Sequence, residues 1–542
     1  MKPADLSLPY ASWRPVQLDI INRAIASDKR YVAIDAPPGV GKTAIAAAIA
    51  RLLGDRCHVL TVTKQLQQQY TSLPGFVEVK GRQNFPCLES DGNADDAACT
   101  IGGAKNPRCP YYVQKDAAIQ SPEVAFNYAY WLAQANHVGF GRPRDDEGDD
   151  EKRETRFSAP DVLVCDEAHL LKNMVRSFAT IGLRVTTLSL ILGNKRVNAP
   201  REDAEFSEWV RWAQHNKDIA DHVYSQMSKA VDKSDKRAVR HLKSLKATRD
   251  AIRQIAQADP EDWIMQETHW GWEAKPIWVH HLVPKYVLRH AKEKVIFISA
   301  TILNRDIFCN LHGIPIDETE FIQVGSPFPV RSRPVVYRPV GKVGRGHSID
   351  PLVDAIRDIL SQHGDERGII HTVSFRLATQ LLGALDREFP GRLFGHEGAD
   401  RAAALDRLRS TPGAVLVSPS MTTGVDLPYD LLRWQVICKL PFPDMGDKQI
   451  KAQMKDASRD NPLSKGQKAY NYDTVATLVQ TYGRIMRAED DAGITYLLDE
   501  NWRWFRPANR DLLPGWFTEA VKWDKPKGDA ISADKLFAEL GL

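Results

Sequence analysis

The stretch "RYVAIDAPPGVGKTAIAAAIARLL", residues 30–53, predicts a strand, a loop and a helix in direct succession. A β-type run opens it, and an alanine-rich run of strong helix formers begins near Lys42. In the loop, Gly39 and Gly41 allow backbone N–H groups to approach phosphate oxygens. Lys42 can reach the β- and γ-phosphates, and the Thr43 hydroxyl can hold Mg²⁺ at the helix N-terminus. The stretch therefore predicts an α/β domain with a Walker A phosphate site.

The loop departs from the strict G-x-x-x-x-G-K-[ST] pattern at one position. Ala36 stands where the first glycine is expected, and Pro37 and Pro38 stiffen the turn. The alternative is a chance glycine-rich turn. The strand before the loop and the helix after it favour the phosphate site.

A second stretch, "APDVLVCDEAHLL" at residues 159–171, predicts a buried strand that ends in two adjacent carboxylates. Such a pair suits magnesium-dependent phosphate chemistry, with Asp166 on the metal and Glu167 polarising the attacking water. Alone, the tetrapeptide "DEAH" would be an acidic helix N-terminus. Together with the phosphate loop, it predicts a site of nucleotide hydrolysis. Cys165 is expected to be a small buried strand residue.

Length and composition describe a multidomain globular protein. The 542 residues suffice for two or three packed domains, and a formal charge of +3 requires any nucleic-acid surface to be a local patch. The N-terminus lacks a secretory-signal pattern, and no apolar run approaches the roughly 20 residues that span a bilayer. Seven cysteines, an odd number, argue against a disulfide framework, so we expect a cytoplasmic protein with no membrane association.

Further motifs follow in a fixed order. "SWRPVQ" precedes the phosphate loop, "VIFISATIL" carries Thr301 after a strand, and "QTYGRIMRAEDDAG" brings Gln480, Arg484 and Arg487 together. With "APPGVGKT", "DEAH", "GSPF", "TGVDLP" and "KLPFPD", the series resembles that of the XPD/DinG-like DNA helicases of superfamily 2, from residue 13 to about residue 523. The resemblance implies an α/β fold of two RecA-like parallel-sheet lobes.

The resemblance also assigns roles to single residues. Gln17 corresponds to the adenine-reading glutamine, with Arg14 expected beside it at the nucleotide, and Thr301 to the residue that links hydrolysis to the DNA track. Four second-lobe residues are implied at the nucleotide, two facing it and two acting as arginine fingers: Asp426 and Gln480, then Arg484 and Arg487. A cation from the opposing lobe stabilises the transferring phosphoryl group only when the lobes close. Thr423 departs from the acidic residue that relatives usually show, so no role is assigned to it.

Domain boundaries follow from motif spacing. His169 and Ser299 lie much further apart than one βα step requires, which predicts an insertion. Residues 228–257 have a cationic helical composition, which fits the arch of relatives or a solvated helical face. The expected divisions are a first lobe (1–85, 119–172 and 266–320), a cysteine-containing insertion (86–118), a helical arch-like insertion (173–265) and a second lobe with a C-terminal cap (321–542).

Two further segments have a distinctive composition. Residues 142–156, "RPRDDEGDDEKRETR", are expected to form a mobile charged loop. Residues 500–523 are dense in aromatic side chains, for which a packed cap is favoured over base stacking: Trp502, Trp504, Phe505, Trp516 and Phe517.

The cysteine-containing insertion leaves its cofactor open. In many XPD/DinG-like relatives four cysteines bind a [4Fe–4S] cluster, and the last lies in a "CPYY" motif. Here Cys87 and Cys109 match the first and last positions, and Cys99 matches one of the middle pair. Three alternatives remain: a cluster with a non-cysteine ligand, a loop without metal, or a zinc site completed by Asp91, Asp95 or Asp96.

The resemblance implies an ATP-dependent helicase that uses ATP and Mg²⁺, moves 5′→3′ on single-stranded DNA and unwinds forked duplex. The alternatives are an RNA helicase and a nucleotide-gated remodelling or assembly factor that does not unwind. The "CPYY" motif favours DNA. We expect a monomer, and protein partners stay open.

Overall fold

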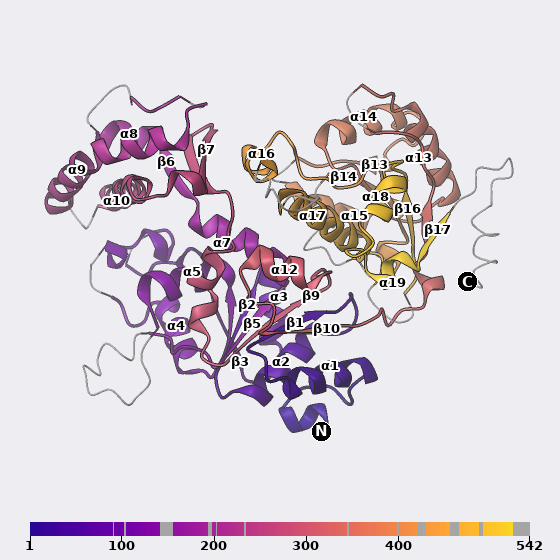
Figure 1. Cartoon of the computed structure of the whole chain (residues 1–542), viewed down its shortest axis with the longest axis horizontal. Coiled ribbons are helices and arrows are strands. Elements are labelled where there is room, and N and C mark those ends of the chain that lie inside the picture. Colours follow the sequence, from indigo (N-terminus) through magenta and orange to yellow (C-terminus); the bar gives the residue numbers. More distant parts are fainter. Residues whose placement is uncertain are drawn as a thin grey trace.

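Two separate parallel sheets, each of seven strands, organise the chain (Figure 1). They are seen in a computed structural model, which describes residues 1–89, 91–101, 105–140, 156–192, 198–201, 203–231, 235–343, 346–397, 400–419, 427, 429–455, 465–486 and 491–523. Most of the charged run at 142–156 lies outside these residues, as do Thr423, Asp426 and Arg487. The two sheets confirm the predicted α/β fold of two RecA-like lobes.

The first sheet forms the lower part of the molecule in Figure 1. Strands β1, β2 and β5 are buried along their whole length, as expected of parallel strands covered by helices on both faces. In sheet order the strands are β10 (Thr319–Gln323), β1 (Tyr31–Asp35), β9 (Lys294–Ser299), β5 (Val162–Asp166), β2 (Cys57–Thr61), β4 (Glu123–Asn127) and β3 (Phe76–Val79). Cys57 and Cys165 are both buried in these strands, as predicted for Cys165.

Helices cover the first sheet. The alanine-rich helix α2 is buried over its central residues, because small side chains let it fit between the sheet and α1. Pro15 starts α1 and Pro110 starts α4, where a missing N–H costs no helical hydrogen bond. The helices are α1 (Pro15–Ala26), α2 (Lys42–Leu53), α3 (Lys64–Thr71), α4 (Pro110–Gln120), α5 (Tyr128–Ala133), α7 (Leu171–Ala179), α11 (Leu282–Tyr286) and α12 (Arg305–His312).

The insertion after α7 contains helices and a small antiparallel sheet. Its elements are β6 (Ile181–Arg184), α8 (Val185–Ile191), α9 (Phe206–Ala230), α10 (Lys236–Ala256), β7 (Trp263–Thr268) and β8 (Gly271–Pro276). The insertion contains two long helices, and α10 buries one face through Leu245 and Ile252 against a core that includes Trp209. The predicted boundary at residue 265 falls inside β7. Because β8 pairs with both β6 and β7, the small sheet continues to Pro276.

The second sheet lies at the upper right of Figure 1. In order, its strands are β13 (Leu393–Phe394), β14 (Val415–Ser418), β12 (Gly368–His371), β15 (Trp434–Ile437), β16 (Ile494–Leu497), β11 (Val335–Tyr337) and β17 (Val521–Trp523). Its helices are α13 (Asp350–Gln362), α14 (Phe375–Leu385), α15 (Arg401–Ser410), α16 (Lys448–Lys455), α17 (Lys465–Tyr482), α18 (Trp502–Ala508) and α19 (Gly515–Thr518).

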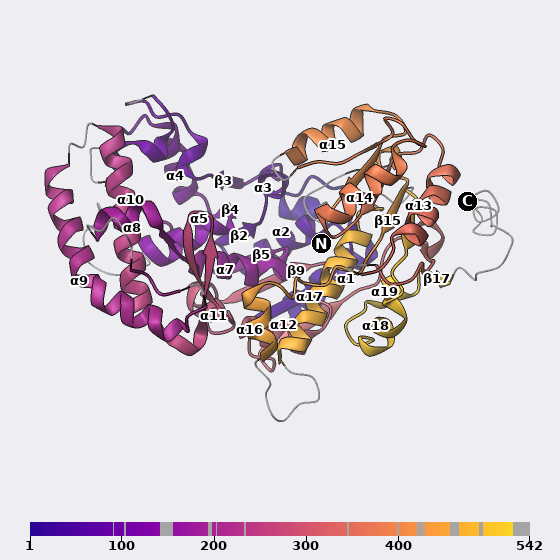
Figure 2. The same ribbon diagram turned by 90° about the horizontal axis from the view of Figure 1, so that it is seen from above.

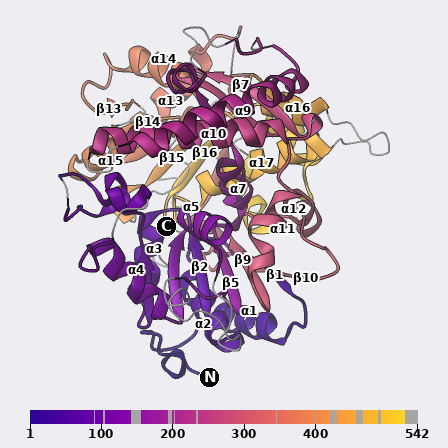
Figure 3. The same cartoon turned by 90° about the vertical axis from the view of Figure 1, so that its left-hand side faces the viewer.

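The helical insertion contacts both the cysteine-containing insertion and the second lobe. Seen from above, the insertion and the second lobe occupy opposite ends of the molecule (Figure 2), and from the side α9 and α10 run across it above the first lobe (Figure 3). Lys243 of α10 donates to the backbone oxygen of Asp95, and its Nζ lies 3.9 Å from the Asp95 carboxylate. At the other end, Gln449 of α16 donates to the Pro276 carbonyl at 2.6 Å. The insertion therefore bridges regions far apart in sequence.

The C-terminal aromatic residues pack into the second lobe. Trp502, Phe505, Trp516 and Phe517 are buried, as predicted for a cap. Trp504 differs, because 53% of its surface is exposed.

Candidate functional site

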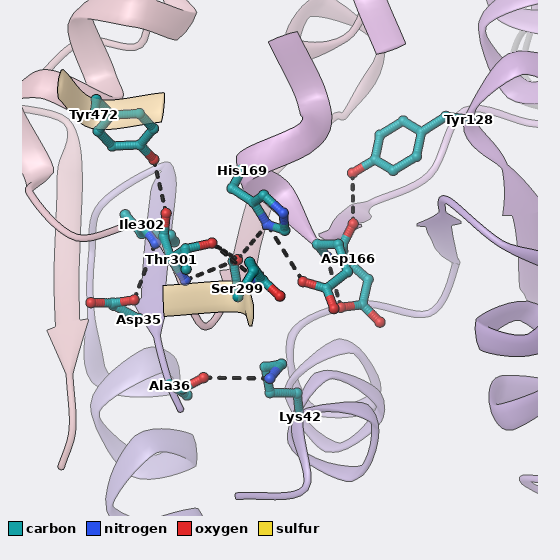
Figure 4. Close-up of polar contacts among 12 residues, drawn as sticks. Asp35, Ala36, Lys42, Tyr128, Asp166, His169, Ser299, Thr301, Ile302 and Tyr472 are labelled. Atoms are coloured by element: carbon teal, nitrogen blue, oxygen red, sulfur yellow. Dashed lines mark hydrogen bonds and ion pairs between the residues drawn. The ribbon is translucent and has the colours of Figure 1, made fainter. Parts of the chain in front are cut away.

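The phosphate loop lies between β1 and α2. Gly39 and Gly41 have φ values of +80° and +88°, a region that glycine enters without strain, and Gly41 caps α2. Both glycines are also closely approached, since a Cβ on Gly41 would lie 2.5 Å from Gln17 Nε2. Lys42 folds back so that its Nζ lies 3.4 Å from the Ala36 carbonyl oxygen (Figure 4). The loop has the strand, loop and helix context that its sequence predicted.

Two residues of the "SWRPVQ" stretch hold this loop from α1. Gln17 is buried, donates from Nε2 to the Val40 carbonyl at 2.8 Å and accepts from the Arg14 backbone N–H at 3.0 Å. Arg14 donates from Nη1 to the Gly39 carbonyl at 2.8 Å. The structure therefore places both beside the phosphate loop, where they bind its backbone. Adenine reading by Gln17 stays a prediction.

The acidic pair lies at the end of β5, facing Lys42. Asp166 is 3% exposed, and its carboxylate accepts from the Tyr70 hydroxyl at 3.0 Å and from the Glu167 N–H at 2.8 Å. Tyr128 donates to the Asp166 backbone oxygen at 3.1 Å (Figure 4). Glu167 adopts φ +49°, an unusual conformation for a residue with a side chain. This turn lets the chain leave the strand and start the next helix with both carboxylates at the sheet edge.

Burial and the neighbouring charge raise the pKa of Asp166. Desolvation is the main cause, Glu167 adds to it, and Lys42 opposes it, which leaves a pKa of about 6. A buried carboxylate beside a second carboxylate gains most from a nearby divalent cation, so the donor set fits Mg²⁺. The residues that would hold it are Asp166 and Thr43, whose hydroxyl now donates to Gln69 Oε1 at 3.4 Å.

A chain of polar contacts leads from His169, beside the acidic pair, toward the second lobe (Figure 4). His169 Nδ1 lies 3.5 Å from Glu167 Oε2 and 2.8 Å from Ser299 Oγ. Ser299 Oγ lies 3.2 Å from Thr301 Oγ1, and Gln480 of α17 donates to the same Thr301 oxygen at 3.0 Å. Burial lowers the pKa of His169 to about 4, so its ring is neutral near pH 7. The chain joins the hydrolysis pair to the opposing lobe through uncharged groups.

Other contacts across the cleft surround this chain. Tyr472 donates to the Thr301 carbonyl at 2.9 Å, and Asp473 of the same helix forms an ion pair with Lys172 of α7. Lys172 is 6% exposed, and burial lowers its pKa while Asp473 opposes that shift. The positive charge of Arg484 is close enough to depress the pKa of His169. Of the second-lobe residues predicted at the nucleotide, Gln480 and Arg484 are therefore brought to the site, and Asp426 and Arg487 lie outside the described residues.

Sequence reasoning missed several members of this site. Asp35 is buried at the end of β1, accepting from the Ile302 N–H at 3.1 Å and from Gln323 Nε2 at 2.9 Å. Its position at a strand end beside the phosphate loop was the available signal. No sequence signal pointed to the roles of Tyr70 and Tyr472, because both lie on helices without a recognised motif.

Comparison with known proteins finds helicase families and relatives. The chain matches a family model described as "Type III restriction enzyme, res subunit" over residues 10–191 and one described as "Helicase C-terminal domain" over residues 356–520. It is 28% identical over 213 residues to "ATP-dependent DNA helicase YoaA" of Escherichia coli, covering 38% of this chain and 32% of that protein. It is 26% identical over 241 residues to "ATP-dependent DNA helicase DinG" of Photobacterium profundum, covering 40% of this chain and 34% of that protein.

A solved structure named "XPD_Helicase" shares the fold, with a TM-score of 0.65 and 13% identity, covering 95% of this chain and 100% of that one. Together these matches support an XPD/DinG-like helicase of superfamily 2. The two family models fall on the two lobes, one carrying the phosphate loop and acidic pair and the other carrying Gln480 and Arg484. The aligned segments span about a third of the length of the curated relatives.

The cysteine-containing insertion does not fit the cluster that XPD/DinG-like relatives suggest. A [4Fe–4S] cluster takes four thiolates. Among the described residues, no three His, Cys, Asp or Glu side chains are grouped closely enough to hold a metal ion. Cys99 Sγ instead lies 3.4 Å from Arg82 Nη1, and the Arg82 guanidinium lies over the rings of Tyr111 and Tyr112 at 4.6 and 5.2 Å.

A guanidinium at the sulfur competes with a metal cation for the same electrons. The described residues therefore support neither the cluster nor the zinc alternative. The side chain of Asp96 lies outside them.

Within the residues that the structure describes, no helix is long and apolar enough to cross a membrane.

Proposed function

We propose that this XPD/DinG-like chain is an ATP-driven motor that moves along single-stranded DNA in the 5′→3′ direction and unwinds forked duplex. The observation that carries the proposal is the hydrogen-bond chain from His169 through Ser299 and Thr301 to Gln480, which starts 3.5 Å from the Glu167 carboxylate. It ties the groups that would sense the γ-phosphate to a helix of the other lobe. A change at the nucleotide can therefore be transmitted as a change in lobe position.

Hydrolysis begins in the first lobe. The N–H groups of the loop and the Lys42 ammonium hold the phosphates, and the Glu167 carboxylate accepts a proton from the attacking water. Thr43 and Asp166 would hold Mg²⁺, which when bound would neutralise part of the phosphate charge. His169 lies 3.5 Å from the Glu167 carboxylate and is neutral near pH 7, so it adds no charge that would weaken that base.

The second lobe completes the site when the cleft is closed. Gln480 already bonds Thr301, and we propose that Arg484 and Arg487 stabilise the charge that develops on the transferring phosphoryl group. We assign Asp426 to the same nucleotide-facing set by resemblance. Loss of the γ-phosphate removes the attraction between these cations and the first lobe, which opens the cleft and advances the motor by one step.

We propose that a nucleic-acid strand binds between the helical insertion and the second lobe. The cavity there has a volume of about 870 Å³. Its lining includes four lysines of α16 and α17, four carboxylates of the insertion and two indole rings: Lys448, Lys451, Lys455 and Lys465, then Asp203, Glu205, Glu261 and Asp262, then Trp263 and Trp278. The lysine side of the cavity is the one that can take phosphates. Ammonium groups neutralise backbone phosphates and indole rings stack on bases of any sequence. These contacts favour salt-sensitive binding with little sequence preference.

The choice of DNA rests on the "CPYY" motif and on the printed names of the two curated relatives. We propose single-stranded and forked DNA as partners, a monomer as the active form and the cytoplasm as its location.

Strand displacement on matched forks of DNA and RNA, each with a 5′ or a 3′ tail, tests the proposal. We expect ATP-dependent displacement of the DNA fork with the 5′ tail. Preference for the RNA fork would instead identify an RNA helicase, and ATP turnover without displacement of any fork would identify a remodelling factor.

A further inference from the structure

The segment that joins the two lobes places an aromatic ring against the phosphate loop. Phe328 ends the "GSPF" motif and is 4% exposed. A Cβ on Gly39 would lie 2.1 Å from Phe328 Cζ and 2.5 Å from its Cε2, so the ring edge rests directly on this glycine. The phosphate loop of the first lobe thus has a neighbour that belongs to the segment leading into the second lobe.

The backbone of Phe328 is held by the second lobe. Its carbonyl accepts from Arg333 Nε at 3.0 Å, and Arg333 is only 2% exposed. The same guanidinium donates to the Trp516 carbonyl, to Glu519 at 2.6 Å and to the Tyr482 hydroxyl at 3.2 Å. Tyr482 donates in return to the Arg333 carbonyl at 2.8 Å. A buried guanidinium with four acceptors is a rigid joint, because moving it would leave buried polar groups without partners.

This joint lies next to the arginine-bearing turn. Tyr482 is the last residue of α17, and Gly483 and Arg484 follow it directly. Gly483 also meets the phosphate loop, since a Cβ there would lie 2.7 Å from Pro38 Cγ. Two consecutive residues of the loop are therefore contacted, Pro38 by Gly483 of the second lobe and Gly39 by Phe328 of the segment leading into that lobe.

We propose that Phe328 and Arg333 are positioning residues that keep the Gly483–Arg484 turn aligned with the phosphate loop. When phosphate binding moves the loop, the Phe328 ring moves with it. Arg333 passes this movement from the Phe328 backbone to Tyr482, and Tyr482 sets the position of the Gly483–Arg484 turn. The inference rests on the proposed function insofar as Arg484 is taken to act on the nucleotide. It also gives a reason for Pro37 and Pro38, because a stiff loop transmits displacement better than a glycine would.

The test replaces Phe328 and separates nucleotide binding from turnover. Phe328→Ala should bind the non-hydrolysable analogue AMP-PNP within about threefold of the wild type, because the phosphate contacts are intact, while kcat for ATP falls at least about tenfold. Phe328→Met, which refills most of the volume, should recover more than half of kcat. Phe328→Tyr should fail, because its hydroxyl would extend from the ring atom nearest to Gly39. Phe389→Ala, in a separate core cluster of the second lobe, is the matched control and should leave kcat unchanged.

A second pair of variants tests Arg333. Arg333 and Arg338 both lie within 2.6 Å of a carboxylate oxygen, on Glu519 and Asp358, but only Arg333 also holds Phe328 and Tyr482. Arg333→Lys should retain AMP-PNP binding and lose turnover, because an ammonium cannot reproduce the fork of the guanidinium. Arg338→Lys should turn over ATP as the wild type does. Thermal unfolding with and without AMP-PNP shows that each variant is folded at the assay temperature.

Two results would overturn the inference. Unchanged kcat in folded Phe328→Ala would show that the ring only fills space, and parallel loss of AMP-PNP binding and kcat would make it a nucleotide contact. All these measurements use basal turnover without nucleic acid. A wild type that hydrolyses ATP but unwinds nothing would therefore contradict the proposed motor and leave this inference to be judged on its own.

Discussion

The nucleotide site and the cysteine-containing insertion were both marked by motifs, yet only the first assembles into a set of converging groups. At the nucleotide site, residues at or just beyond the ends of β1, β5 and β9 and a residue of α17 meet through hydrogen bonds. In the insertion, three cysteines from one short stretch are not grouped as ligands, and Arg82 reaches Cys99 instead. Buried polar groups must find partners, so a motif at the end of a buried strand indicates which side chains will lie close together. A spacing of cysteines indicates such a grouping only when the set of metal ligands is complete.

The largest expected effect breaks the nucleotide site itself. Glu167→Gln should lower ATP hydrolysis about 10³-fold, because an amide cannot accept the proton of the attacking water, while AMP-PNP still binds. Lys42→Ala should abolish hydrolysis by removing the phosphate cation. Steady-state turnover and AMP-PNP titration check both. Glu320→Gln, a change of the same kind on β10, is the control, and retained turnover in Glu167→Gln would refute the assignment.

The next effect breaks the link between the lobes. Thr301→Val removes the hydroxyl that Ser299 and Gln480 share while keeping the side-chain shape. Turnover in the presence of single-stranded DNA should fall about tenfold, the cost of unpaired buried polar groups. Thr319→Val removes a buried hydroxyl that bonds only within the first lobe, and should change turnover little. Equal turnover in both variants would show that the chain of hydrogen bonds carries no coupling.

Each element at the nucleotide site was predictable from local sequence, but not their contacts. The strand, loop and helix at residues 30–53 and the buried strand before Asp166 follow from periodicity and turn residues. The bond between His169 and Ser299 joins residues 130 positions apart, and no local pattern specifies such a pairing. The small sheet of β6, β7 and β8 was missed for the same reason, since antiparallel pairing across two long helices depends on packing. The interaction of Arg82 with Cys99 could not be inferred either, because arginine belongs to no metal motif.

A smaller effect is expected on the stability of the cysteine-containing insertion. Arg82→Met should destabilise the cysteine-containing insertion by about 1–2 kcal/mol, because it removes two cation–π contacts and the hydrogen bond to Tyr112. Cys87→Ala with Cys99→Ala should cost less. Proteolysis within the insertion and thermal unfolding measure both.

Metal analysis of protein purified without oxygen complements these variants. We expect no stoichiometric iron or zinc and no cluster absorption band. One cluster per chain, lost in the double cysteine variant, would contradict the arrangement around Arg82.

The smallest expected effect is a pH dependence inside the first lobe. Burial, with Arg56 and Lys292 nearby, lowers the pKa of His58 to about 3 from its ordinary 6.5, so the folded state binds fewer protons than the unfolded state between these values. The stability from neutral His58 is complete above pH 6.5 and is lost as pH falls toward 3. His58→Gln should therefore flatten the fall in thermal midpoint between pH 7 and pH 4. An unchanged slope would show that other groups dominate acid unfolding.

The most direct measurement of the central claim is the rate of ATP hydrolysis with and without single-stranded oligothymidylate. If the hydrogen-bonded chain from His169, beside the acidic pair, to Gln480 of the second lobe couples hydrolysis to strand binding, the oligonucleotide should raise the rate at least about tenfold. The oligonucleotide should not raise the rate of ATP hydrolysis by the Glu167→Gln variant. A wild-type rate that is the same with and without the strand would contradict the account.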